Sequence, residues 1–297
     1  MAYIPVYIEG KLKAVIRRIE EAAAFDGVMD ENFNDSTSLK TLVRLSGMSE
    51  RSLREWFKIY TGLSISRYAN KRRIEYAARI FRLFPETSKS EVSEFIGLNS
   101  SHALYPFMKR NGVVDIDGLR NYYNSADFSP LNFRFDYLPD CIMFYTLDKV
   151  HYDECSTVEF EMGHWNIIER YINERFPKAT KIGDVGFAID RYVENKPDGG
   201  IFISGIISEN IAKSKLSDNM IGDIGWRKFI GHKYVVFTHK GDYKRLSDFY
   251  SSSLHTLLNR TDIQIEKSIL IMEKYLNSPI DTPTEELITE IWIPIIS

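Results

Sequence analysis

The chain has 297 residues, a net charge of −3 and 44% hydrophobic residues, which is enough for about two ordinary globular domains. No stretch approaches the roughly 18 apolar residues of a membrane-spanning helix, and the opening MAYIPVYIEGKLK lacks the pattern of a secretory signal. Cys141 and Cys155 have neither metal-ligand nor redox spacing. We therefore expect a cytoplasmic protein with free thiols, no membrane segment and no disulfide framework.

The overall charge hides an asymmetry along the chain. Residues 36–125 hold 15 Lys and Arg against 8 Asp and Glu, a net charge of +7. Residues 126–297 hold 19 against 26, a net charge of −7, and residues 1–35 contribute −3. A basic segment beside an acidic one favours a nucleic-acid binder joined to a domain with another task, although chance fluctuation gives the same pattern.

Apolar residues recur at helical spacing through most of the first 123 residues. After a first helix at Gly10–Phe25 and a polar loop at Asp26–Asp35, the pattern predicts three helices: from Thr37 or Ser38 to Leu45, at Ser49–Tyr60, and from Ser64 or Ile65 to Phe84. Gly47 provides the turn before the Ser49 helix, and Ser49 is a favourable N-cap. The first half is therefore predicted to be all-helical.

A similar order follows in shorter form. Ser90–Ile96 is a predicted short helix, Gly97 a turn, Ser100–Arg110 a second helix and Asp115–Tyr123 a last short one. Two turn-helix units about fifty residues apart are thus joined by one long helix, a spacing that lets both face one side of a DNA duplex.

Specific residues of this half resemble the AraC-type DNA-binding domain, which has two helix-turn-helix units linked by a long helix. The matching positions are Gly47-x-Ser49, Leu53, Phe57-Lys58, Thr61-Gly62, Tyr68 and Arg73-Ile74-x-x-Ala77. The resemblance implies an AraC/XylS-type domain over residues 1–124 that binds double-stranded promoter DNA.

The residue types on the two reading helices suit DNA contact. Arginine donates to guanine O6 and N7, and glutamate accepts from the cytosine amino group. In the first unit the expected DNA-binding residues are Arg51, Ser52, Arg54, Glu55 and Lys58, and in the second unit they are Ser101, His102, Tyr105 and Lys109. Lys71, Arg72 and Arg110 are further candidates for phosphate contacts, whereas Arg73 is expected to be structural.

The second unit departs from the family pattern. Pro106 stands where family members usually carry a basic residue, and proline removes an intrahelical hydrogen bond. An alternative is therefore an interaction module that contacts a protein such as RNA polymerase and reads little DNA sequence.

Strand patterns dominate after a polar boundary at Asn124–Pro130. The predicted elements are strands at Phe133–Tyr137 and Cys141–Leu147, a helix at Phe160–Arg175, strands at Val185–Tyr192, Ile201–Ile207 and Lys233–His239, a helix at Leu246–Asn259, extended segments at Ile263–Tyr275 and a strand at Leu287–Ile295. Strand–helix–strand–strand thus occurs twice. This order predicts a duplicated β-α-β-β domain over residues 131–297, with an antiparallel sheet and helices on one face.

The last third resembles the GyrI-like effector-binding domain. The residues that carry the resemblance are Tyr234-Val-Val-Phe-Thr-His-Lys-Gly241 and Tyr243, then Glu273-x-Tyr275-Leu276-Asn277, Pro283 and Thr289-Glu290-Ile-Trp-Ile-Pro294. The resemblance implies a small-molecule effector and makes Glu290 the ligand-facing acid. Together the two halves resemble a transcription regulator.

Alternation along the last strand predicts that Glu290 and Trp292 face away from the helices while the isoleucines pack beneath them. A carboxylate beside an indole suits a cationic or amphipathic effector. The expected ligand-binding residues are Glu290, Trp292, Tyr145, Tyr234 and Tyr275. No cofactor, metal or nucleotide motif is apparent, so we expect no enzyme. A hydrolase using Glu273 and Glu290 as a carboxylate pair is the less favoured alternative.

Overall fold

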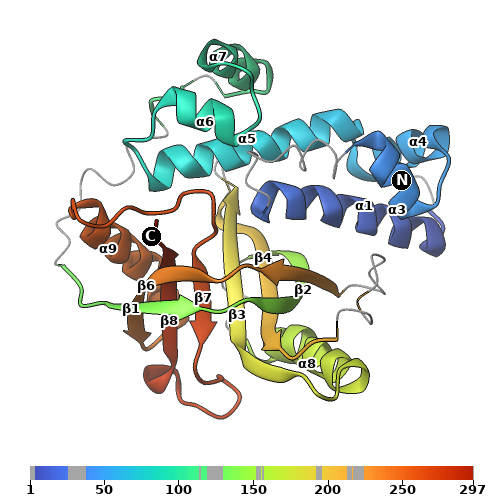
Figure 1. The fold of residues 1–297 in the computed structure, drawn as a ribbon. Coiled ribbons are helices and arrows are strands. Elements are labelled where there is room, and N and C mark those ends of the chain that lie inside the picture. Colours follow the sequence, from blue (N-terminus) through green and yellow to red (C-terminus); the bar gives the residue numbers. More distant parts are fainter. Residues whose placement is uncertain are drawn as a thin grey trace. The chain divides into compact units, whose positions relative to one another are not determined.

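The computed structural model describes residues 4–25, 38–113, 115–118, 130–151, 155, 157–191, 196–212, 216 and 224–296. By contacts the chain divides into two compact units: unit 1 comprises residues 1–124 with 192–195, and unit 2 comprises 125–191 with 196–297 (Figure 1). The boundary expected at Asn124–Pro130 lies almost wholly outside the described residues, as does most of the helix expected at Asp115–Tyr123.

Unit 1 is helical throughout its described residues. Its helices are α1 (Val6–Phe25), α3 (Leu39–Ser46), α4 (Glu50–Thr61), α5 (Ile65–Leu83), α6 (Lys89–Phe95) and α7 (Ser101–Arg110). Side-chain oxygens of Ser38, Ser49, Ser64 and Ser88 each accept a backbone N–H at a helix start. Gly47 ends α3 at a φ of 59°, a left-handed conformation that glycine adopts without strain.

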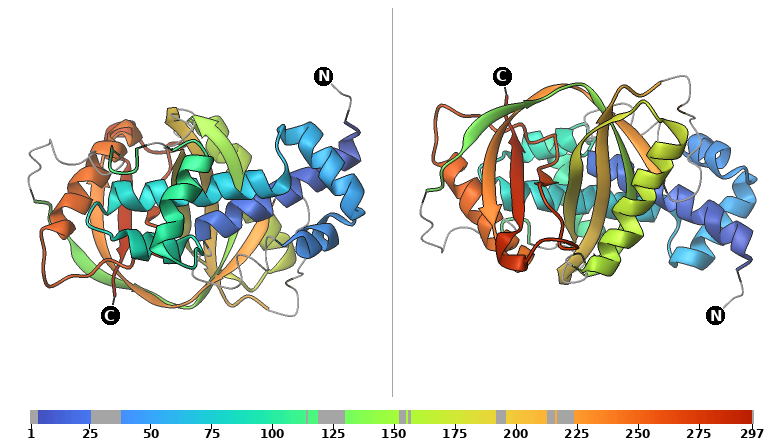
Figure 2. Two further views of the ribbon diagram at one scale, coloured as in Figure 1. Left: turned by 90° about the horizontal axis from the view of Figure 1, so that it is seen from above. Right: turned by 90° about the horizontal axis from the view of Figure 1, so that it is seen from below.

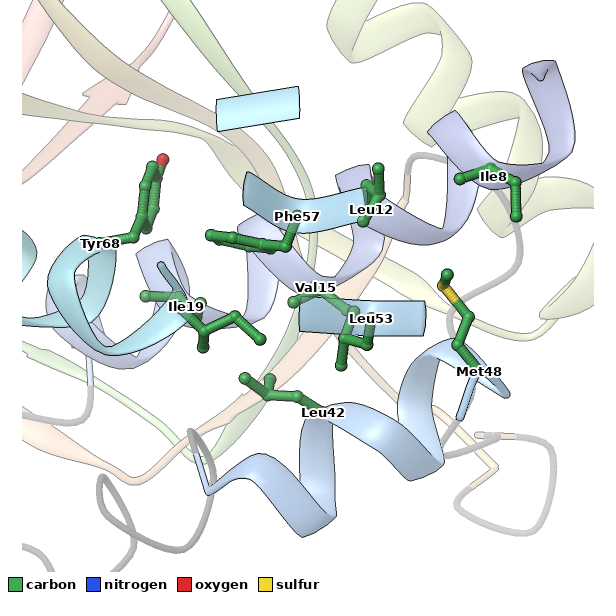
Figure 3. Close-up of a cluster of buried hydrophobic side chains, with 10 residues drawn as sticks. Ile8, Leu12, Val15, Ile19, Leu42, Met48, Leu53, Phe57 and Tyr68 are labelled. Carbon is green, nitrogen blue, oxygen red and sulfur yellow. The ribbon is translucent and has the colours of Figure 1, made fainter. Parts of the chain in front are cut away.

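One apolar cluster holds α1, α3, α4 and the start of α5 together. Figure 3 shows side chains from these helices converging: Leu12, Val15 and Ile19 from α1, Leu42 from α3, and Leu53 and Phe57 from α4, all fully buried. Tyr68 of α5 packs edge-on against Phe57, with ring centres 5.5 Å apart. Burial of these side chains fixes which side of α4 is left to solvent.

Arg73 of α5 attaches the second helix pair to the long helix. Its guanidinium donates to the carbonyl oxygens of Ile96 and Gly97, at 2.9 Å and 3.0 Å, and lies over the Phe107 ring at 5.2 Å. Desolvation lowers the pKa of this arginine. The prediction of a structural Arg73 is confirmed, because one side chain joins the end of α6 and the inner face of α7 to α5.

Unit 2 contains an antiparallel sheet of eight described strands, in the order β1-β6-β8-β7-β3-β4-β2-β5. Their bounds are β1 Arg134–Leu138, β2 Cys141–His151, β3 Thr180–Arg191, β4 Lys196–Glu209, β5 Gly225–Phe229, β6 His232–Lys240, β7 Met272–Tyr275 and β8 Ile288–Pro294. The strand order is symmetric about the β7–β3 pair in the middle of the sheet, and we call this pair the seam. The sequence pattern did not predict β5.

Two helices, α8 (Val158–Arg175) and α9 (Leu246–Leu258), pack on the same face of the sheet (Figure 1). Trp165, Ile168 and Ile172 of α8 cluster with Phe144 and Phe202. On α9, Phe249 packs against the His239 ring at a tilt, with ring centres 5.0 Å apart. The short 3₁₀ turns η4 (Tyr243–Arg245) and η5 (Thr284–Glu286) precede α9 and β8.

A long two-stranded ribbon closes the sheet. Leu138 of β1 pairs with His232 of β6, and Cys141 of β2 pairs with Phe229 of β5. The two pairs are three residues apart on both sides of the ribbon. The antiparallel register therefore continues across both two-residue connections, 139–140 and 230–231. Because β1 and β5 are the two end strands and the ribbon joins each of them to the strand beside the other, the sheet must curl (Figure 2).

Replacing Arg73 with Ala should loosen α6 and α7 without disturbing α3 and α4. Loss of charge-assisted hydrogen bonds to two carbonyls should speed amide exchange over residues 92–110 by about tenfold or more in the full-length protein. Hydrogen exchange followed by mass spectrometry measures this. Arg67→Ala, an exposed arginine on the same helix, is the matched control. Equal acceleration in α4 would contradict the assigned role.

Candidate functional site

Helix α4 presents a polar surface to solvent. Its N-cap Ser49 accepts the backbone N–H of Ser52 at 3.2 Å. Leu53 and Phe57 are fully buried, which leaves Ser52 half-buried and five charged side chains exposed: Glu50, Arg51, Arg54, Glu55 and Lys58.

Each of the two arginines is paired with a glutamate of its own helix. Arg51 Nε donates to Glu55 Oε1 at 3.1 Å, and Arg54 Nη2 lies 2.9 Å from Glu50 Oε1. Such exposed i,i+4 pairs contribute little to stability. A base edge or phosphate can therefore compete with the glutamates for these donors.

The expected reading surface of α7 also lies in solvent. His102, Tyr105 and Lys109 are exposed, and Ser101 is half-buried. Pro106 lies inside the helix, which nevertheless continues over Ser101–Arg110. Because proline has no N–H, the His102 carbonyl oxygen loses its usual helical donor.

Arg72 is not a surface residue, so its expected phosphate contact is wrong. Its guanidinium lies 3.8 Å from Glu20 of α1 and 5.4 Å from the Tyr68 ring centre, with 4% of the residue exposed. Tyr68 also donates its hydroxyl proton to Glu20. The packing of α1 against α5 buries this arginine, whereas Lys71 beside it stays exposed.

On β8, Glu290 and Trp292 face away from α8 and α9. Glu290 is 6% exposed, and both its carboxylate oxygens are engaged. Oε1 accepts from Arg134 Nη2 at 2.8 Å, and Oε2 accepts from the Trp292 indole N–H at 2.9 Å. Lys274 Nζ lies 5.1 Å from the centre of the Trp292 ring. Two cations of the chain itself therefore contact the acid and the indole that the sequence assigns to a ligand.

The sheet separates the five predicted ligand residues into two groups. Tyr234 lies beside Trp292, with ring centres 5.4 Å apart, and Tyr145 lies on the same face of β2, with β7, β3 and β4 between it and β8. Tyr275 lies on the helix-covered face, together with Glu273. The predicted set therefore does not form one site, because Tyr275 is on the opposite face from Glu290.

A second carboxylate forms the centre of a cluster on the helix-covered face. Glu273 is 4% exposed and accepts two tyrosine hydroxyls, from Tyr275 at 2.5 Å and from Tyr250 of α9 at 3.0 Å. Glu273 lies on β7, beside the seam with β3, where Gly186 is its cross-strand neighbour. A Cβ on Gly186 would lie 2.5 Å from the Tyr275 hydroxyl, so the glycine makes room for the tyrosine.

Aromatic rings surround this carboxylate. Trp165 of α8 meets Tyr275 edge-on at 5.5 Å, and Tyr243 of η4 meets it at 5.7 Å. Tyr243 and Tyr250 are half-buried, so the cluster extends from the sheet to the surface. We call these five residues, Glu273, Tyr243, Tyr250, Tyr275 and Trp165, the seam cluster.

The surroundings of Tyr243 and Tyr275 in the seam cluster raise the pKa of both hydroxyls. Burial raises the pKa of Tyr275 well above its ordinary value, and the charge of Glu273 raises it further. Burial and the charges of Glu161 and Glu273 raise the pKa of Tyr243. The hydroxyls of Tyr243 and Tyr275 therefore remain protonated and able to donate.

Strand and helix periodicity already indicate that the residues of this cluster point inward, but the sequence prediction groups Tyr275 with Glu290 and not with Glu273. Glu273 and Tyr275 are two positions apart on one strand, which places both side chains on one face. Trp165 and Tyr250 follow the inward stripes of their helices. What the sequence lacked was the packing of both helices on the face that carries Glu273.

The described residues hold no group of three or more His, Cys, Asp or Glu arranged for a metal ion, and no helix among them is long and apolar enough to cross a membrane.

Comparison with known proteins identifies the C-terminal part. Residues 203–296 match the sequence model of the GyrI-like small molecule binding domain. A comparison with curated proteins gives no match.

Similar solved structures include the EcmrR C-terminal domain, with 15% identity, 56% of this chain and 98% of that chain covered, and a TM-score of 0.41. A second similar structure is the EcmrR-DNA complex in EcmrR-RPo. Its EcmrR chain is 14% identical to this chain, the match covers 86% of this chain and 98% of that chain, and the TM-score is 0.42. A third is a hydrolase from Listeria innocua, with 12% identity, 57% of this chain and 94% of that chain covered, and a TM-score of 0.40.

Cys141 should resist alkylation in the folded protein. Its burial, with smaller contributions from Asp140 and Glu209, raises the thiol pKa to about 11, so only about one thiol in a thousand is ionised at pH 8. Peptide mapping after brief iodoacetamide treatment should find the half-buried Cys155 labelled and Cys141 unlabelled. Equal labelling of both before unfolding would contradict this environment.

Proposed function

We propose, starting from the GyrI-like domain at residues 203–296, that this protein is a DNA-binding transcription regulator controlled by a small amphipathic cation. In this proposal unit 1 is an AraC-type domain with two helix-turn-helix units. Unit 2 is a duplication in which β1-β2-α8-β3-β4 corresponds to β5-β6-α9-β7-β8. The protein acts by binding and not by catalysis.

The seam cluster is the observation that supports a cationic effector. Its carboxylate is buried, and its two described side-chain hydrogen bonds come from neutral hydroxyls, so the negative charge is solvated but not cancelled by them. Aromatic rings attract cations through their negative faces, and they bury the apolar part of an amphipathic ligand. A flat organic cation matches both properties.

The seam cluster replaces Glu290 as the proposed effector site. Glu290 is held in an ion pair with Arg134, and Lys274 lies on the ring of Trp292. A cation binding there must displace two cations of the chain itself. At Glu273 a cation competes with tyrosine hydroxyls, which can rotate away without leaving a buried charge unpaired.

Helix α4 supports the DNA-binding part of the proposal. A capped helix with a buried apolar stripe and exposed Arg51 and Arg54 has the geometry of a major-groove reader. The double pairing of these arginines with Glu50 and Glu55 lowers nonspecific attraction to phosphate. Sequence preference then depends on base edges that accept hydrogen bonds from Arg51 and donate one to Glu55 at the same time.

Two alternatives remain distinct from this proposal. In the first alternative, unit 1 is an interaction module that contacts RNA polymerase. The exposed Tyr105 beside Pro106 on α7 favours this alternative. The hydrolase with paired carboxylates is disfavoured, because Glu273 and Glu290 lie on opposite faces of the sheet and cannot act on one substrate atom.

Regulation requires that the effector bind two states of the protein with different affinity. The tyrosines of the seam cluster come from α9, η4 and β7, so a ligand that displaces their hydroxyls changes how these elements pack on the sheet.

Replacing Glu273 with Gln should weaken binding of ethidium, a flat aromatic cation, by about tenfold or more, equivalent to about 1.4 kcal/mol. Fluorescence titration of nucleic-acid-free, full-length protein measures this. Glu290→Gln is the matched control, because it removes the same charge from the neighbouring strand on the opposite face. A larger loss of ethidium affinity in Glu290→Gln than in Glu273→Gln would place the effector site on the sheet face that carries Glu290.

Replacing Arg51 and Arg54 together with Ala should abolish sequence preference in DNA binding. The readout is the ratio of affinities for the best sequence selected from a random library and for scrambled DNA, at one fixed salt concentration. Lys13→Ala, an exposed basic residue on α1, is the control. If wild-type protein selects no sequence, the interaction module is favoured instead.

A further inference from the structure

Strand β1 is an open edge of the sheet. It pairs with β6 on one side, and no described strand pairs with it on the other. Its side chains Phe135 and Tyr137 are 62% and 56% exposed, whereas Trp226 and Phe229 of β5, the strand at the other end of the order, are half-buried. An edge strand that exposes apolar side chains is a template for pairing with a further strand.

The backbone groups of Phe135 and Tyr137 point away from β6. Ile295, just after β8, donates its N–H to the Lys233 carbonyl oxygen of β6 at 3.1 Å, so the odd-numbered residues of β6 face β8 and its even-numbered residues face β1. Those residues pair with the even-numbered residues of β1, which leaves the N–H and C=O groups of Phe135 and Tyr137 on the outer edge. The Tyr137 N–H accordingly donates to the side chain of Asp136, at 2.8 Å.

The sequence of β1 is complementary to itself in the register that these outward groups allow. When two copies of β1 pair antiparallel about a twofold axis at Phe135, each Phe135 faces the other, and their N–H and C=O groups form a reciprocal pair of hydrogen bonds. Arg134 of each copy then lies opposite Asp136 of the other, at positions where Cα atoms are about 4.5 Å apart. Opposite charges directly across a strand pair stabilise it.

The aromatic rings follow the same register. Phe133, the residue before β1, comes opposite Tyr137 of the other copy, and within one copy its ring centre lies 5.7 Å from that of Phe135. Aromatic pairs across strands add to the stability of pairing. The Tyr137 N–H exchanges its bond to Asp136 for one to the Phe133 carbonyl oxygen of the other copy, which releases the carboxylate for Arg134 of that copy.

Arg134 can make this contact without leaving Glu290. Its bonds to Glu290 and Asp136 both come from Nη2, at 2.8 Å and 3.3 Å, and a guanidinium carries further N–H donors. The side chains of Arg134 and Asp136 are 46% and 39% exposed. Pairing therefore joins the exposed ion pair of each copy into one network of alternating charges.

We propose that β1 pairs with β1 of a second copy of this chain, so that two sheets join edge to edge about a twofold axis at Phe135. A second copy fits this edge better than an unrelated strand, because one register matches outward backbone groups, opposite charges and aromatic rings at once. A strand pair this short buries little surface, so the dimer is weak. The inference goes beyond the proposed function, since neither α4 nor the seam cluster takes part in it.

Sedimentation velocity of nucleic-acid-free, full-length protein measures the dimer, at concentrations from about 1 to about 300 μM, the range of a weak complex. Wild-type protein should shift from monomer to dimer across this range. Phe135→Lys and Phe135→Glu should each weaken association by about tenfold or more, because like charges then face each other at the axis. Both variants should fold, since Phe135 is exposed.

An equal mixture of the Phe135→Lys and Phe135→Glu proteins should restore association, because the introduced charges are opposite in the mixed dimer. Recovery in the mixture alone identifies Phe135 as the residue that faces itself. Ile230→Lys, which changes a more exposed apolar residue of the same ribbon outside β1, is the matched control and should leave the dimer unchanged.

Wild-type protein that stays monomeric over the whole range would overturn the proposal and leave the edge to a strand of another protein. A dimer that survives both Phe135 variants, or a mixture that associates no more strongly than either variant alone, would also overturn it. The same holds if Ile230→Lys weakens the dimer as much as Phe135→Lys does.

Discussion

The continuous antiparallel register of the β1–β2 and β5–β6 ribbon is the constraint on which unit 2 depends. Through two-residue connections, both sides of the ribbon cross from the β1–β6 pair at one end of the strand order to the β2–β5 pair at the other, so the sheet cannot remain flat. Asp140 holds the crossing: it accepts the Gly231 N–H at 2.7 Å and pairs with Lys228 at 2.8 Å. Curling brings the two halves together at the β7–β3 seam, and both helices flank that seam on one face.

Strand alternation at the seam then separates two kinds of electrostatics. On the helix-covered face, Glu273 is solvated by tyrosine hydroxyls within aromatic rings. On the other face, Glu290 is paired with Arg134 and shares a hydrogen bond with the Trp292 indole. Lys274, the residue after Glu273, projects to this second face and lies over Trp292. Glu273 is therefore the acid of the proposed effector site, whereas Glu290 is joined by its ion pair to Arg134 of the edge strand β1.

In unit 1, too, the arginines away from solvent join helices to one another, whereas the arginines in solvent can contact a partner molecule. Arg72 and Arg73 are adjacent on α5, yet one pairs with Glu20 of α1 and the other binds carbonyls at the end of α6. Arg51 and Arg54 on α4 stay in solvent with weak intrahelical partners. Long side chains at neighbouring positions thus join α1 and the α6–α7 pair to one central helix.

Local signals in the sequence determined the helices, their serine caps, the Gly47 turn and the described strands other than β5, because capping, glycine turns and hydrophobic periodicity act within a few residues. They also determined that Glu290 and Trp292 share a face. Only the tertiary structure decided what those side chains meet. Arg134 lies 156 positions from Glu290, and Tyr250 lies 23 positions from Glu273. Such partners are set by strand order and helix packing, which one-dimensional spacing does not encode. The sequence thus defined a candidate acid on the last strand, and the fold moved the proposed effector site to the other face.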